Sequence, residues 1–189
     1  MRDQVSKVCQ NAYLEIRRIV LSLKPQKTLV SSLVISRLDY CNSLLACVPQ
    51  KHLAKRQRVM NCAARLECRA IRSEHISPLL DDLHWLPVSN RIEFKIATVC
   101  YNIISGSEPP YLADLFQPYT PSQSLRSSAD LRIFRIPIRR NKFQGQRAFS
   151  FTDPVIWNSF PFSVRHAQTL SSFKSQLKTH LVSIYFQVE

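Results

Sequence analysis

Residues 51–72 read KHLAKRQRVMNCAARLECRAIR, and this stretch decides the fold class of the chain. Apolar residues recur in it every three or four positions, which predicts an amphipathic helix with one face in a core. That face consists of Leu53, Val59, Met60, Ala63, Leu66 and Ala70. The rest of the helix is crowded with cations, namely Lys51, Lys55, Arg58, Arg65, Arg69 and Arg72.

The charge of this predicted helix has one sign. Seven basic residues stand against Glu67 alone between Lys51 and Arg72, a local net charge of +6. A nucleic-acid backbone suits such a helix, because each phosphate that a cation neutralises releases counterions and adds affinity. A solvated basic face without a ligand is the alternative, and for one helix in isolation both hypotheses stay open.

The same periodicity predicts further helices around this one. An apolar stripe from Val5 to Leu23 stops before Pro25, and a second helix runs from about residue 28. SRLDYCNSLLACVP, residues 36–49, predicts a bend and a short helix. After Pro87, apolar residues at helical spacing end near Gly106, which suits a helix C-terminus. Residues 1–106 are therefore predicted to form a helical bundle.

The second region, residues 107–189, is richer in loops. Prolines punctuate it, and TPSQSLRSSAD (residues 120–130) is typical of a connector. Residues 130–140 and 141–151 predict a small β-hairpin with its turn at Asn141 and Lys142. A closing helix follows Thr169, with a stripe of Leu170, Phe173, Leu177, Leu181 and Ile184. The predicted fold class is mainly α.

The whole chain is strongly basic. Lys and Arg number 26 against 13 acidic residues among 189, which gives a formal net charge of +13. Such an excess attracts nucleic acid first and anionic membrane surfaces second. The N-terminus lacks the apolar run of a secretory signal, and no stretch reaches the length of a membrane span. We expect an intracellular protein of the nucleus or cytoplasm, neither secreted nor membrane-embedded.

Nothing in the sequence predicts a catalytic site, a metal site or a cofactor. Gly106 and Gly145 are the only glycines, too few for a glycine-rich phosphate loop. The six cysteines lack the close pairs of zinc sites, and reduced core thiols are the simpler interpretation. Trp85 and Trp157 are expected to pack in a core, with stacking on a base as the lesser alternative, and His84 to be half-buried.

Asp81 and Asp82 resemble the metal-holding pair of a polymerase. A polymerase needs such carboxylates in a tight strand–turn–strand hairpin beside a third carboxylate, so that two metals can be held about 4 Å apart. Here the pair lies between Pro78 and Pro87 in a helical region. We predict a helical turn, with the aspartates capping a helix or pairing with an arginine.

Six stretches in one order nevertheless carry a resemblance. They are SRLDYCNSLL (36–45), RVMNCAARL (58–66), HISPLLDDLHWLPVSNRIEFKI (75–96), EPPYLADLFQPYTPSQSLRSS (108–128), RAFSFTDPVIWNSFP (147–161) and LSSFKSQLKTHL (170–181). From about Val8 to Tyr185 the chain resembles the C-terminal region, thumb and post-thumb, of reverse transcriptases from jockey-like non-LTR (LINE-type) retrotransposons. Asp82 matches the acidic residue that this family has before Leu-His-Trp-Leu-Pro.

The resemblance implies a part of an RNA-directed DNA polymerase without its catalytic palm. The palm and the endonuclease of such enzymes lie upstream, and the thumb grips the template–primer duplex by its backbone. The fold implied is a polymerase-thumb-like helical bundle. The chain departs from the family at Arg56, where an apolar residue is expected, and at Glu67-Cys68-Arg69. It also lacks the glycines expected around Cys47 and near Ser107–Glu108.

We therefore predict a non-catalytic protein that binds RNA or DNA independently of sequence. The candidate contacts are Lys51, Lys55, Arg58, Arg65, Arg69, Arg72, Arg139, Arg140, Lys142 and Arg147. The alternative is a protein-interaction fragment or a relic without a nucleic-acid role, which could self-associate through apolar surface on the helices of residues 1–40.

Overall fold

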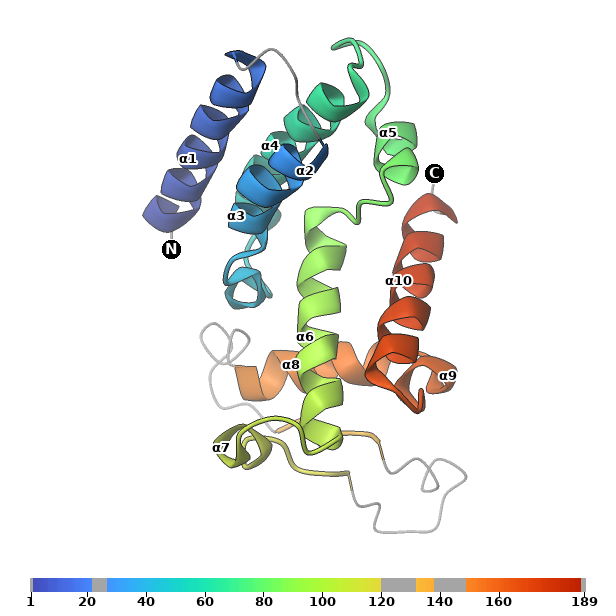
Figure 1. The fold of residues 1–189 in the computed structure, drawn as a ribbon. Coiled ribbons are helices and arrows are strands. Elements are labelled where there is room, and N and C mark those ends of the chain that lie inside the picture. The colour runs from blue at the N-terminus through green and yellow to red at the C-terminus, as the bar shows by residue number, and fades with distance from the viewer. Residues whose placement is uncertain (1, 22–26, 120–131, 138–148, 188–189) are drawn as a thin grey trace. The chain divides into compact units, whose positions relative to one another are not determined.

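The computed structural model describes residues 2–21, 27–119, 132–137 and 149–187, and the predicted mainly helical fold is confirmed (Figure 1). The described residues contain no strand. The chain divides into two compact units, Met1–Ile92 and Glu93–Glu189. The division lies within helix α6, Val88–Ile104, instead of after residue 106 as the sequence suggested. The reason is that Cys100 and Tyr101 pack with later residues.

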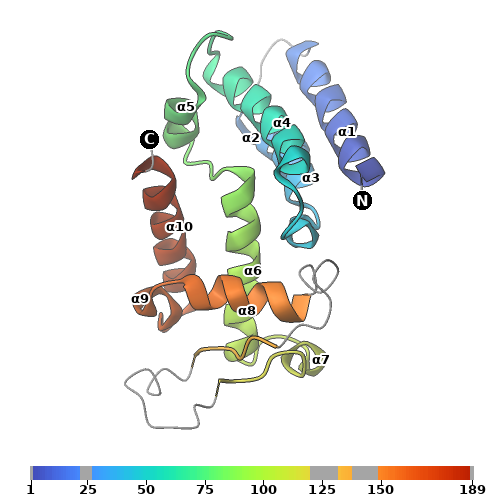
Figure 2. The same cartoon turned by 180° about the vertical axis from the view of Figure 1, so that it is seen from behind.

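The first unit is built on two long helices. Helix α1, Arg2–Leu21, packs against α4, Gln50–Cys68. A helical segment between them in sequence contacts both, and α5, Ile76–Asp82, packs on α4 (Figure 2). That segment comprises α2 (Lys27–Val30), the π-helix η1 (Ser31–Ile35) and α3 (Ser36–Asp39), and the 3₁₀ helix η2 (Asn42–Leu45) follows it.

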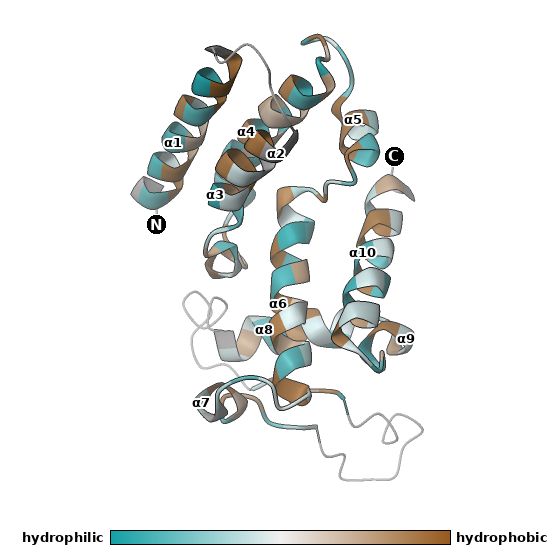
Figure 3. Ribbon diagram, in the orientation of Figure 1, coloured by the Kyte–Doolittle hydropathy of each residue, from teal (hydrophilic) through white to brown (hydrophobic). Residues whose placement is uncertain are grey.

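The core of this unit follows the apolar periodicity of the sequence. Figure 3 shows hydrophilic and hydrophobic residues alternating around α1 and α6, as amphipathic helices require. In α1 the buried side includes Cys9 and Glu15, whereas Leu14 and Val20 are exposed. The buried apolar side chains include Val5, Ala12, Ile19, Val30, Val34, Leu38, Val59, Met60, Ala63 and Leu80.

Three helices end with a residue in the left-handed region. Arg69 ends α4 at φ 52°, His84 follows α5 at φ 52°, and Gly106 follows α6 at φ 69°. At each end a backbone N–H bonds a carbonyl five residues earlier, such as Ala70 to Arg65 at 3.0 Å. This pattern satisfies the last carbonyls of a helix, and only Gly106 adopts it without a steric cost.

The start of α6 is held within the first unit by side chains. The Val88 N–H donates to Gln57 Oε1 of α4 at 2.8 Å, which satisfies one of the free donors of the helix N-terminus. Arg91 Nε donates to Asp39 Oδ1 at 2.7 Å. Pro87 therefore lies just before a helix that α4 and α3 position.

The second unit has an aromatic core. Trp157 of α8, Phe149–Ser159, is fully buried, with its ring centroid 5.8 Å from that of Phe173. Phe173 belongs to α10, Leu170–Gln187, and stacks on Tyr101 at 4.4 Å. The short helices α7 (Pro110–Ala113) and α9 (Phe162–Arg165) complete the unit. Core packing is therefore confirmed for Trp157.

The predicted β-hairpin is not supported. Residues 149–151 of its second half are helical, and residues 138–148 lie outside the described residues. The first half is extended but pairs elsewhere: Arg135 N–H donates to Gln117 O at 2.7 Å, beside an isolated antiparallel bridge between Pro118 and Phe134. The Phe134 N–H donates to Asn158 Oδ1, and Asn158 Nδ2 donates to the Phe134 carbonyl. The Asn158 side chain thus makes the two hydrogen bonds that a neighbouring strand would make in a hairpin.

Two further predictions need correction. Cys9 and Cys100 are buried, but Cys41, Cys47 and Cys62 are exposed: Cys41 and Cys47 lie in turns, and Cys62 lines an open hollow beside α1. His84 is exposed where it was expected half-buried, since its left-handed backbone turns it outward at the end of α5. Among the described residues, no helix is both long and apolar enough to cross a membrane.

Candidate nucleic-acid interface

Helix α4 gathers most of the predicted cations on one face. We call Lys51, Lys55, Arg58, Arg65 and Arg69 the basic stripe. At 3.6 residues per turn the first four positions fall within about 80° of arc, and Arg69 is the residue directly after α4, so the five extend over about 27 Å. All of them are exposed except Arg65, which is partly exposed. The sequence pattern identified these cations, and the structure shows which of them are exposed.

Arg65 and Arg72 depart from a simple row of free cations. Arg65 Nη2 donates to the carbonyl of Glu74 at 3.2 Å, so this side chain also holds the turn after α4. Arg72 is exposed but lies in that turn, beyond the last helical residue. The stripe therefore consists of four exposed cations and of Arg65, which is partly exposed and also makes a hydrogen bond within the protein.

The second predicted basic segment cannot be placed on the same surface. Arg139, Arg140, Lys142 and Arg147 lie outside the described residues. Nearby, Arg132 Nη1 donates to the carbonyls of Arg165 at 2.8 Å and Ala167 at 3.2 Å. Arg132 is therefore a structural cation of the second unit.

Arg56 lies on the opposite side of α4 from the stripe and is only 3% exposed. Its Nη1 donates to the Leu38 carbonyl at 2.8 Å, near the C-terminal end of α3, where the helix dipole favours a cation. Burial lowers its pKa, an effect opposed by nearby Cys9, Asp39 and Cys41. The guanidinium therefore stays inside the protein and does not extend along the helix surface to solvent.

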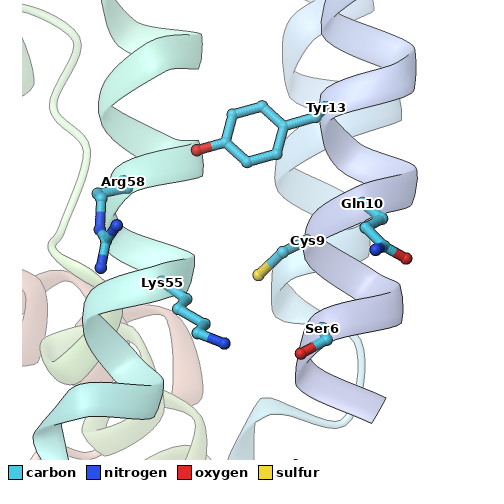
Figure 4. A pocket seen from close by; sticks show the side chains of 6 residues that line it. All are labelled: Ser6, Cys9, Gln10, Tyr13, Lys55 and Arg58. Carbon is cyan, nitrogen blue, oxygen red and sulfur yellow. The ribbon is translucent and has the colours of Figure 1, made fainter. Parts of the chain in front are cut away.

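A groove adjoins the basic stripe between α1 and α4. Figure 4 shows its six lining side chains, with the Tyr13 ring projecting from α1 toward α4. The hollow has a volume of about 260 Å³ and is lined by Ser6, Cys9, Gln10, Tyr13, Lys55 and Arg58. Lys55 and Arg58 therefore belong both to the stripe and to a concave surface. We call this hollow the α1–α4 groove.

The α1 wall of this groove was not predicted from the sequence. Ser6, Gln10 and Tyr13 recur at spacings of four and three, which places them on one face of α1. That spacing of polar and aromatic residues was visible in the sequence. Only the packing of α1 against α4 shows that this face meets Lys55 and Arg58.

The ionisable groups of the groove influence one another. Burial raises the pKa of the Cys9 thiol, and the positive charges of Arg56, Lys55 and Arg58 oppose this shift. The pKa of Tyr13 is raised by burial first and then by the neighbouring Cys62 side chain. At neutral pH the groove therefore presents neutral Cys9 and Tyr13 side chains beside two cations.

Two acidic residues of the first unit, Glu15 and Asp39, pair with arginines outside the stripe. Glu15 Oε1 forms ion pairs with Arg18 Nη1 at 3.2 Å and with Arg37 Nη2 at 2.9 Å, and Asp39 forms one with Arg91. These three arginines all lie outside the stripe. Exposed cations on one helical face suit an extended polyanion, because they can contact successive phosphates without recognising bases.

Asp81 and Asp82 lie in the last turn of α5, and both are exposed. The predicted helical turn is confirmed, but the capping role is wrong, because a carboxylate stabilises a helix at its N-terminus. No cluster of three or more metal-ligating side chains occurs in the described part of the chain.

Comparison with known proteins adds no family to this description. No protein-family model, no curated protein and no solved structure matches the sequence.

Proposed function

We propose that the chain binds the sugar-phosphate backbone of RNA or DNA through the basic stripe of α4. The observation that carries this proposal is the alignment of Lys51, Lys55 and Arg58 as exposed cations on one face of α4, with exposed Arg69 directly after the last helical residue. A nucleic-acid strand advances about 3.4 Å per nucleotide along a duplex. The 27 Å of the stripe thus span about eight nucleotides, enough for each cation to reach a separate phosphate.

We further propose that the chain is a thumb and post-thumb fragment of a LINE-type reverse transcriptase, non-catalytic by itself. Six ordered motifs support the resemblance, and one backbone feature agrees with it. Cys47, near which the family is expected to have glycine, has φ 58°, a conformation that favours glycine. A basic helical thumb would hold a template–primer duplex while a separate palm carries the chemistry.

Binding of this kind should depend on salt and hardly on sequence. Each phosphate contact on a duplex contributes about −0.9 to the slope of log affinity against log salt. Four exposed cations predict a slope of about −3 to −4, provided that all four contact phosphate.

The test compares two triple charge reversals in the full chain. One changes Lys51, Lys55 and Arg58 to Glu on the stripe; the other changes Lys95, Lys174 and Lys178, exposed residues of α6 and α10, to Glu. Both alter the net charge equally. Binding to a fluorescein-labelled RNA–DNA duplex at low salt should fall at least 10-fold further in the stripe variant. Equal losses would show that total charge, and not the stripe, determines binding.

Self-association is the second candidate function, favoured by exposed apolar side chains on α1. Leu14 is 52% exposed and Val20 is 56% exposed. A second copy of the chain could cover them. Sedimentation velocity of wild type and a Leu14→Ser, Val20→Ser variant tests this candidate. A dimer in wild type that dissociates in the variant would support it, whereas a wild-type monomer would exclude it.

A further inference from the structure

The α1–α4 groove is large enough to hold part of a ligand. Its hollow of about 260 Å³ adjoins a second hollow of about 570 Å³, and both are lined by Gln10 and Tyr13. Pockets for small molecules commonly measure about 300–1,000 Å³. One nucleotide is therefore a ligand of suitable size.

Tyr13 gives the groove an aromatic surface. Its side chain is 39% exposed, and Figure 4 shows the ring reaching from α1 toward α4. Tyr13 and Cys62 of α4 line the second hollow together, so the ring lies between the two helices. Because a tyrosine side chain has only two rotatable angles, little conformational entropy is lost when a planar ligand stacks on it.

The other groups of the groove suit the remaining parts of a nucleotide. Lys55 and Arg58 supply positive charge from α4 for phosphates. Ser6 and Gln10 supply hydrogen-bonding groups from α1 for the edge of a base or for a sugar. A duplex keeps its bases stacked inside, so only an unpaired base could use the Tyr13 ring.

We propose, on the basis of the backbone binding proposed above, that the α1–α4 groove accepts an unpaired base of single-stranded nucleic acid. The base stacks on Tyr13, and the adjacent phosphates contact Lys55 and Arg58. The stripe then continues to hold the strand by its backbone. The preferred ligand is therefore a single strand or the unpaired end of a duplex.

The test uses two fluorescein-labelled 12-mers with the same phosphates, oligo(dT) and a strand made only of abasic sites. Stacking on an aromatic side chain raises affinity about 5- to 150-fold per base. Wild type should therefore bind oligo(dT) about 10-fold more tightly than the abasic strand. Tyr13→Leu should remove this difference and leave abasic binding unchanged, while Tyr13→Phe should keep it. Tyr111→Leu, at a 66% exposed tyrosine of α7, is the matched control and should also keep it.

The outcomes separate the stacking site from the backbone binding on which it rests. Equal wild-type affinity for the two strands, with binding to both, overturns the stacking site alone. A preference for oligo(dT) that survives Tyr13→Leu also overturns it. If neither strand binds at low salt, the backbone binding fails and the stacking site with it. The wild-type comparison decides the question even if Tyr13→Leu lowers stability.

Discussion

Two arginines on opposite faces of α4 show how differently the chain uses the same residue. Arg56 is 3% exposed and donates to the Leu38 carbonyl, whereas Arg58 is exposed and borders a groove. In the second unit, Arg132 and Arg165 also bond backbone carbonyls. Part of the basic excess is therefore structural. A count of cations cannot locate a binding surface; their burial and acceptors can.

The sharpest contrast comes from the same substitution at both positions. Arg56→Glu places a carboxylate in a buried site beside a carbonyl, and the free energy of unfolding should fall by about 3–5 kcal/mol. Arg58→Glu should change it by less than about 0.5 kcal/mol and should weaken RNA binding instead. Urea denaturation of both variants measures this difference. Similar losses of stability would contradict the assignment of the two faces.

A buried acid in the second unit extends the comparison to negative charge. Asp153 is 2% exposed, and burial raises its pKa from 3.8 to about 7. Between pH 3.8 and about pH 7, Asp153 has lost its proton in the unfolded chain but keeps it in the folded chain. The free energy of unfolding therefore falls as the pH rises through this range, and it levels off above about pH 7. From pH 5 to pH 8 the loss should be about 2–3 kcal/mol.

Asp153→Asn is the control for this prediction, because the amide keeps the shape and stays neutral. Urea denaturation at pH 5 and pH 8 should show a clearly smaller pH dependence in the variant, and greater stability than wild type at pH 8. Burial also raises the pKa of Glu93, so a residual effect of the same sign is expected. An identical pH dependence in both proteins would show that Asp153 does not titrate as described.

Substitution of Arg65 should affect both stability and binding, unlike substitution of Arg56, which should affect mainly stability, or of Arg58, which should affect mainly binding. It belongs to the stripe, but its guanidinium also bonds the Glu74 carbonyl. Arg65→Ala should lower the free energy of unfolding by about 1 kcal/mol and also weaken binding to the duplex. Denaturation and fluorescence anisotropy on the same preparation measure both effects. A binding loss with unchanged stability would mean that the contact with Glu74 contributes nothing.

Arg69→Gly should separate stability from binding with the smallest effects. Arg69 has φ 52°, which glycine adopts without strain, so the variant should be more stable by up to about 1 kcal/mol. It should also lose one phosphate contact, which reduces the salt slope by about 0.9. Reduced stability would show that the arginine side chain itself stabilises the end of α4.

Much of the fold was accessible from the sequence because apolar periodicity determines which helix faces are buried. The helices around Val59, Ile96 and Leu177 were predicted on that basis, and all three residues are buried. The hairpin was not predictable, because the partner of Phe134 is the side chain of Asn158, an interaction without a sequence period.

The candidate interface was predicted only in part. The cations of α4 were identifiable, but their separation into exposed and buried groups was not. The position of Arg56 depends on the Leu38 carbonyl, which α3 brings to it from 18 residues away in sequence. The groove depends on the packing of α1 against α4, so Tyr13 could not be connected with Lys55 before the structure was known.

The most direct test of the central claim is the salt dependence of binding to an RNA–DNA duplex. Wild type should be compared with a variant that carries Gln at residues 51, 55 and 58. If these three cations contact phosphates, the slope of log affinity against log salt should become less negative by about 2.7. An unchanged slope would contradict the claim that the basic stripe of α4 holds the backbone.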